Sequence, residues 1–89
     1  MNKINYDILV FTTKYVLKKG SPILRVLHDK DENWQFLGDE GNLQEVDAMI
    51  VSLGEIVEFD TTLSEIISLP AGKQALRSNK GGTWYIYDL

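Results

Sequence analysis

The apolar residues of this chain come in short runs, and polar turns separate each run from the next. Runs of this length that are rich in β-branched and aromatic side chains indicate strands rather than long helices. We expect strands over 7–12, 23–28, 34–37, 48–53 and 83–87. The turn at 29–33 is rich in Asp and Asn and predicts a hairpin between the second and third of these strands.

Helical signals are local. Thr13 is a suitable N-cap and Gly20 a suitable C-terminal residue for one short helical turn. Ser52 favours the start of a second short helix over 54–59. Residues 43–47 fit a helical turn only ambiguously, and 73–77 fits either a strand or a connector.

The strongest helical signal lies over 61–69. Asp60 is a good N-cap, and Leu63, Ile66 and Ile67 share the i, i+3, i+4 spacing of one helix face. Pro70 then ends the segment. We expect Leu63, Ile66 and Pro70 to build the fold together with Trp34 and Phe36, which share one face of a strand.

These elements predict one small α+β domain over residues 1–89, with a mostly antiparallel sheet of about five strands and one or two short helices. A chain of 89 residues is long enough for a single thin core. No apolar run approaches the length of a membrane span, and no signal-peptide pattern opens the sequence. With no cysteine present either, we expect a cytoplasmic protein.

The residue types exclude most catalytic designs. His28 is the only histidine, and no nucleophile motif surrounds the serines, so we expect it to lie at a strand end rather than in a triad. The glycines form no phosphate-binding loop. Residues 29–40 resemble a calcium loop, but Trp34 occupies the position that needs glycine. We therefore expect no catalytic residue, no metal site and no cofactor, and hence no enzyme.

Charge is concentrated in one segment. Residues 29–47 hold seven acids and one base, whereas the whole chain has a net charge of −4. Such a stretch repels phosphate backbones, which argues against a nucleic-acid ligand. It would attract a basic protein partner, although acidic stretches of this kind are also common in solvated loops.

Three stretches give the chain a family resemblance. They are residues 11–23, the motif Trp34-Gln35-Phe36-Leu37-Gly38-Asp39-Glu40, and residues 60–72 followed by Ala75 and Arg77. Together they resemble a bacterial family of small domains of unknown function, classified as predicted immunity proteins of polymorphic toxin systems. The resemblance covers about residues 11–77 and implies a protein that neutralises a toxin by direct binding. Thr61 stands where the family commonly has proline, so a close sister group fits as well.

The sequence thus predicts a non-catalytic protein-interaction module. We expect its partner to contact Asp39, Glu40, Glu45 and Asp47 in the acidic segment, with Trp34 as an aromatic anchor. Two alternatives stay open: an accessory or regulatory domain with an unrelated protein partner, and, ranked last, a small hydrolase that uses acidic residues. We expect neither a nucleic acid nor a membrane among its partners.

The altered calcium-like loop generates a first testable prediction. Calorimetric titration of the protein with calcium or zinc should show no binding tighter than millimolar, because the glycine of the loop is missing and further ligands are scarce. A micromolar signal that Asp29→Ala abolishes would contradict this expectation.

Overall fold

The computed structural model describes residues 4–89, which form one α+β domain around a mixed sheet. The strand order is β4-β1-β3-β2-β5-β6. All neighbouring strands are antiparallel except β1 and β3, which run parallel at the centre. The elements are β1 (Leu9–Thr13), α1 (Lys14–Lys19), β2 (Arg25–His28), β3 (Trp34–Leu37), η1 (Glu45–Asp47), β4 (Ala48–Ser52), α2 (Leu53–Phe59), η2 (Thr61–Glu65), β5 (Lys73–Leu76) and β6 (Tyr85–Asp88).

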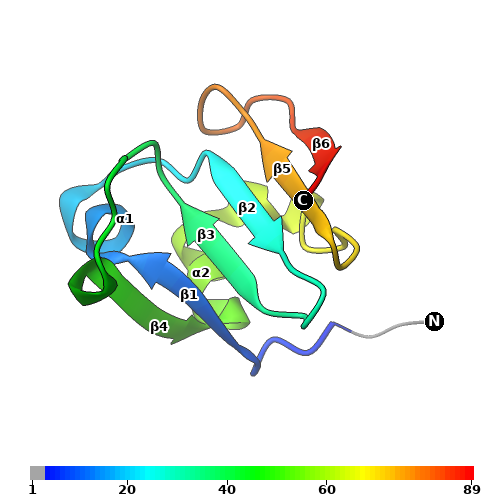
Figure 1. The fold of residues 1–89 in the computed structure, drawn as a ribbon, viewed down its shortest axis with the longest axis horizontal. Helices are drawn as coiled ribbons and strands as arrows, with labels where there is room; N and C mark the ends of the chain where they lie inside the picture. The colour runs from blue at the N-terminus through cyan, green and yellow to red at the C-terminus, as the bar shows by residue number, and fades with distance from the viewer. Residues whose placement is uncertain (1–3) are drawn as a thin grey trace.

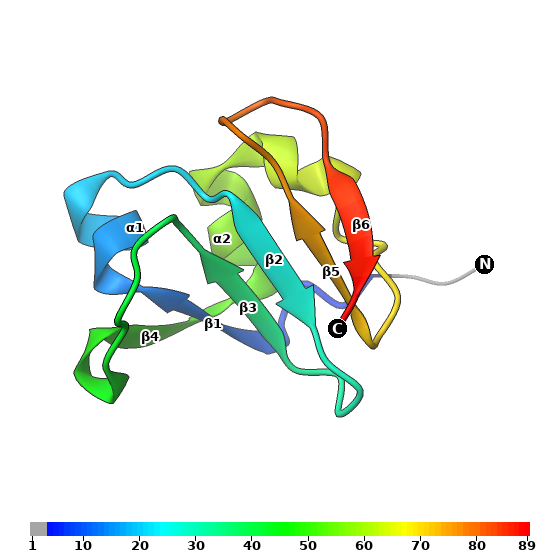
Figure 2. The same ribbon diagram turned by 45° about the horizontal axis from the view of Figure 1, so that its top comes forward.

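The predicted fold class is confirmed, with six strands in the described chain where about five were expected. The additional strand is β5, which pairs with both β2 and β6. The hairpin at 29–33 joins β2 to β3 as predicted. Both views place α2 and the segment that follows it on one side of the sheet (Figure 1 and Figure 2). No helix within residues 4–89 is long and apolar enough to span a bilayer.

The capping residues set the ends of both α-helices as the sequence indicated. The Thr13 hydroxyl accepts a hydrogen bond from the Val16 amide, and Gly20 ends α1 in the left-handed region at φ 77°. Ser52 and Glu55 form a reciprocal capping box at the start of α2. These local hydrogen bonds satisfy amides that have no partner inside a helix.

The segment over 61–69 is not the α-helix that its spacing predicted. It forms the short 3₁₀ helix η2 and then a turn, although Asp60 does cap it by accepting the Thr62 amide at 3.0 Å. Amides at 63, 66 and 69 donate to carbonyls three residues earlier. A 3₁₀ helix has three residues per turn, so it aligns the buried Leu63, Ile66 and Leu69 on one side.

The core fills the side of the sheet that the helices cover. Val10, Val26 and Phe36 point into it from three neighbouring strands and have no exposed surface. Trp34 and Ile66 are buried as predicted, at 5% and 4% exposure. Pro70, in contrast, is exposed, so that prediction was wrong. Its ring ends the segment without packing into the core.

One ion pair lies inside this core. Arg77 Nη2 is 2.9 Å from Asp60 Oδ2, and the two side chains are 0% and 3% exposed. The guanidinium also donates to the Ile23 carbonyl through Nε at 2.9 Å and to the Thr62 hydroxyl through Nη1 at 2.8 Å. It lies 4.2 Å from the centroid of the Trp84 ring. The pair therefore joins four segments that are distant in sequence.

Breaking this pair should destabilise the domain strongly. Arg77→Met keeps much of the side-chain length but leaves the buried Asp60 carboxylate without its positively charged partner. We expect a loss of about 3–5 kcal/mol in the free energy of unfolding, as is usual when one partner of a buried pair is removed. Urea denaturation measures it. Lys73→Met is the matched control, because it breaks only the exposed ion pair with Asp88. Similar midpoints for the two variants would contradict the expectation.

Candidate protein-interaction surface

One face of the sheet is covered by helices, and the opposite one, here called the open face, is not. Figure 1 looks onto the open face, with α2 behind the sheet. Successive strand residues point to opposite faces, and the strand registers bring Leu9, Phe11 and Ile50 together on the open one. Their side chains are 71%, 41% and 58% exposed. Contiguous apolar surface of this kind commonly marks an interaction site.

The open face continues to the other edge of the sheet. Leu37 lies on it in β3, and Leu76, Tyr85 and Tyr87 add exposed apolar and aromatic surface on β5 and β6. Arg25 in β2 is its one charged residue among the described strand residues. The face therefore has an apolar half over β4, β1 and β3, with Leu9, Phe11, Leu37 and Ile50, and a second half over β5 and β6 that exposes two tyrosines.

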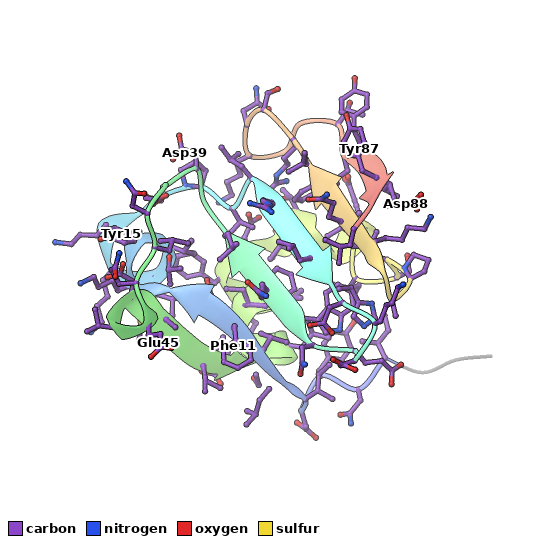
Figure 3. All side chains as sticks on the ribbon, viewed as in Figure 1. Phe11, Tyr15, Asp39, Glu45, Tyr87 and Asp88 are labelled. Atoms are coloured by element: carbon purple, nitrogen blue, oxygen red, sulfur yellow. The ribbon has the colours of Figure 1, made fainter. Side chains whose placement is uncertain are left out.

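The second part of the acidic segment, residues 38–47, lies beside the apolar half of the open face. The chain leaves β3, runs through 38–44 and η1, and returns as β4 at the sheet edge (Figure 1). Asp39 and Glu45 are exposed there, and neither forms an ion pair with any base in the described chain. Figure 3 shows Glu45 and Phe11 near each other and Asp39 at the far bend of this segment. These two carboxylates are free to meet a partner.

Asp47, another of the four acids expected to bind a partner, has a structural position instead. Its side chain is only 7% exposed and lies 3.1 Å from Lys14 Nζ. Its other oxygen accepts a hydrogen bond from the Gln44 amide at 3.0 Å. Asp47 therefore joins η1 to α1, and its negative charge is already compensated by Lys14.

Glu40 is half-buried and turns back against its own loop. A Cβ atom on Gly38 would lie 2.6 Å from Glu40 Oε2 and 3.2 Å from the Pro22 carbonyl oxygen. Gly38 thus leaves the space that the carboxylate occupies. Both carboxylate oxygens are shielded from solvent and have no hydrogen-bond partner within residues 4–89. Glu40 is thus a weaker candidate for a first contact than Asp39 or Glu45.

Trp34 belongs to the core and not to the surface. Its ring stacks on His28 with centroids 3.9 Å apart and on Phe36 with centroids 5.8 Å apart. It is 5% exposed, so a partner docking on the folded domain does not reach it. The sequence shows that Trp34 and Phe36 share a face but does not show which face is covered.

His28 ends β2, as expected, and its ring is held by the backbone. Nδ1 lies 2.7 Å from the Leu69 carbonyl oxygen, so this nitrogen is the protonated donor. No serine or carboxylate within residues 4–89 forms a hydrogen bond with the ring.

The calcium-like loop forms internal hydrogen bonds, because Asp29 Oδ1 accepts hydrogen bonds from the backbone amides of Asp31 and Asn33. In the described chain no three His, Cys, Asp or Glu side chains are grouped to hold a metal ion.

A concavity lies where the open face meets the acidic segment. Its volume is about 300 Å³. Six of the side chains that line it are Phe11, Gln35, Leu37, Leu43, Gln44 and Ala48. Phe11 and Gln35 are register partners across the parallel pair of strands. Sequence reasoning did not single out these residues, because an apolar run gives no sign of which side of its strand stays uncovered.

No model of a known protein family matches the sequence, and neither a curated protein nor a solved structure matches it. The motif resemblance to the immunity-protein family therefore stays a hypothesis. The open face and its two free acids provide the physical basis for a function.

The setting of Asp47 predicts a dependence of stability on pH. The hydrogen bond from the Gln44 amide, and then Lys14, lower the pKa of Asp47 below its ordinary value of 3.8. A carboxyl with a lowered pKa in the folded state stabilises the fold above its unfolded pKa, and this contribution is lost as the pH falls through the folded pKa.

We therefore expect Asp47→Asn to be less stable than wild type near neutral pH, and the difference to shrink as the pH falls below about 3.8. Thermal unfolding across this range measures it. Asp39→Asn is the control, because it removes an exposed carboxylate of the same loop. A difference between Asp47→Asn and wild type that stays constant through the acid range would contradict the prediction.

Proposed function

We propose that this chain is a non-catalytic protein-interaction module that binds a basic protein partner through the open face and the acids beside it. The observation that carries the proposal is the exposed apolar surface of Leu9, Phe11 and Ile50 on a face flanked by the loop that holds Asp39 and Glu45, whose carboxylates have no ion-pair partner among residues 4–89. Exposed apolar surface supplies area that a partner removes from water. The free carboxylates attract a positively charged partner and repel a negatively charged one.

The two parts of the surface have different kinetic effects. Charges at the rim of an interface act mainly on the association rate and are screened over a Debye length of about 8 Å at physiological ionic strength. Buried apolar contacts act mainly on the dissociation rate. A protein that must capture a harmful partner quickly and hold it needs both. This combination fits an immunity protein that neutralises a toxin by direct binding, which is the role that the motif resemblance implies.

In this proposal the module works in the bacterial cytoplasm on a cognate toxin. An accessory or regulatory domain with an unrelated partner would use the same surface, and the identity of the bound protein separates the two. The proposal requires no cofactor. It gives Asp47 and Trp34 structural positions and leaves Asp39 and Glu45 as the acids that contact the partner.

The test uses the protein that the tagged domain captures from its native host, produced in pure form. Asp39→Lys combined with Glu45→Lys should slow association with this protein and flatten the salt dependence of the rate, because the attraction that steers encounter is lost. Stopped-flow mixing over a series of salt concentrations measures both quantities.

The control is Glu58→Lys combined with Glu65→Lys, which makes the same change in net charge at exposed positions on α2 and η2. This pair should associate much more like wild type than the Asp39/Glu45 pair does. Equal rates and equal salt slopes for both double variants and wild type would overturn the proposed use of the acidic segment. Retention of binding by Ile50→Glu would overturn the use of the open face.

A further inference from the structure

We propose that the concavity between β1, β3, β4 and residues 38–47 is a socket for one apolar side chain of the partner, and that the partner segment has Lys or Arg beside this anchor, where it faces Glu45. This inference deepens the proposed function and rests on it. It states which part of the open face is recognised and by what chemistry.

The register of the sheet builds the socket. Phe11 faces Gln35 across the parallel pair and Ile50 across the antiparallel pair, so β1 forms the floor. Leu43 and Gln44 come from the segment that precedes η1 and form a wall. Ala48 opposes Thr13 at the start of β4. Its small side chain leaves open the space that a larger residue would fill.

The size and lining of the socket favour a single apolar group. Its volume of about 300 Å³ is at the lower end of the range for ligand pockets, roughly 300–1,000 Å³. Phe11, Leu37, Leu43 and Ala48 give the lining its apolar character. The Gln44 side-chain amide donates a hydrogen bond to the Asn42 carbonyl oxygen at 3.0 Å, and this bond holds the Gln44 side chain in place. A preformed pocket of this kind holds an anchor residue at a small conformational cost.

The charge around the socket selects the residues beside the anchor. Glu45 lies in the chain between the lining residues Gln44 and Ala48, and it is exposed and without an ion pair in the described residues. Asp39 is the second free acid of the same loop. Lys14, the base that contacts this loop, is already paired with Asp47. Arg25 lies beyond Leu37 on the β2 side of the face. The free charge on the wall side is therefore negative.

The test uses a synthetic probe, so it does not depend on isolating the natural partner. The probe is a short capped peptide with a central phenylalanine and lysines on both sides, titrated into the ¹⁵N-labelled protein at low ionic strength. We expect the amide shifts to cluster in β1, β3 and residues 43–48. One comparison peptide replaces the phenylalanine with alanine, and another replaces the lysines with glutamates. Both should bind at least about tenfold more weakly, because each lacks one of the two interactions.

Two substitutions, Ala48→Phe and Glu45→Lys, test the apolar contact and the charge contact separately. Ala48→Phe places a ring in the socket and should weaken binding of the lysine peptide at least about tenfold. Leu76→Phe is its control, since it makes a similar addition on the open face outside the socket. Glu45→Lys should weaken the lysine peptide and strengthen the glutamate peptide. The folded state of each variant is checked by its amide spectrum.

The outcomes separate the socket from the wider proposal. If the peptide responds to Glu45→Lys but not to Ala48→Phe, or if the shifts lie elsewhere, binding is only electrostatic and the socket is wrong. If Ala48→Phe leaves the captured partner bound while Ile50→Glu releases it, the socket is wrong and the proposed function stands. A partner that every open-face variant still binds overturns the proposed function itself.

Discussion

The fold depends on the buried contact between Arg77 and Asp60. Arg77 follows β5, and Asp60 ends α2, so the pair connects the sheet to the helical layer. The guanidinium also holds the Ile23 carbonyl and the Trp84 ring. Desolvating two charges is costly, and it is offset here because the hydrogen bonds to Asp60, Thr62 and Ile23 lie along the planar guanidinium. The pair thus links the segment before β2, the end of β5 and the chain after α2 on the covered side of the sheet.

Covering one face leaves the other exposed, and this is the surface that we propose binds a partner. Two short helices and a 3₁₀ segment cover one side of the sheet and bury Val10, Phe36, Val26 and Ala75 on its central strands and β5. No described element covers the other side, where Leu9, Phe11 and Ile50 are exposed. In the proposed function, the free acids of the neighbouring loop let this apolar surface distinguish partners by charge. Specificity of this kind comes from repelling the wrong partner as well as from attracting the right one.

Local hydrogen bonding explains which parts of the fold the sequence predicts well. Thr13, Gly20 and Ser52 set helix ends through groups only a few residues away, so their effect is visible in the sequence. The α-helix predicted over 61–69 was wrong because the three-residue spacing of Leu63 and Ile66 is compatible with a 3₁₀ helix as well as with an α-helix. The Thr62 hydroxyl also accepts a hydrogen bond from Arg77, a tertiary contact that holds this segment against the sheet and that the local spacing does not reveal.

The sequence by itself determined the α+β class, the hairpin, the caps and the concentration of acids in 29–47, since each follows from neighbouring residues. Only the tertiary structure decided what those acids do. Asp47 pairs with Lys14 from a different element and becomes structural, whereas Asp39 and Glu45 form no ion pair with any base in residues 4–89. It likewise placed Trp34 in the core and Phe11 on the open face. Alternation assigns residues to two faces of a strand, but only the packing of distant helices determines which face is buried.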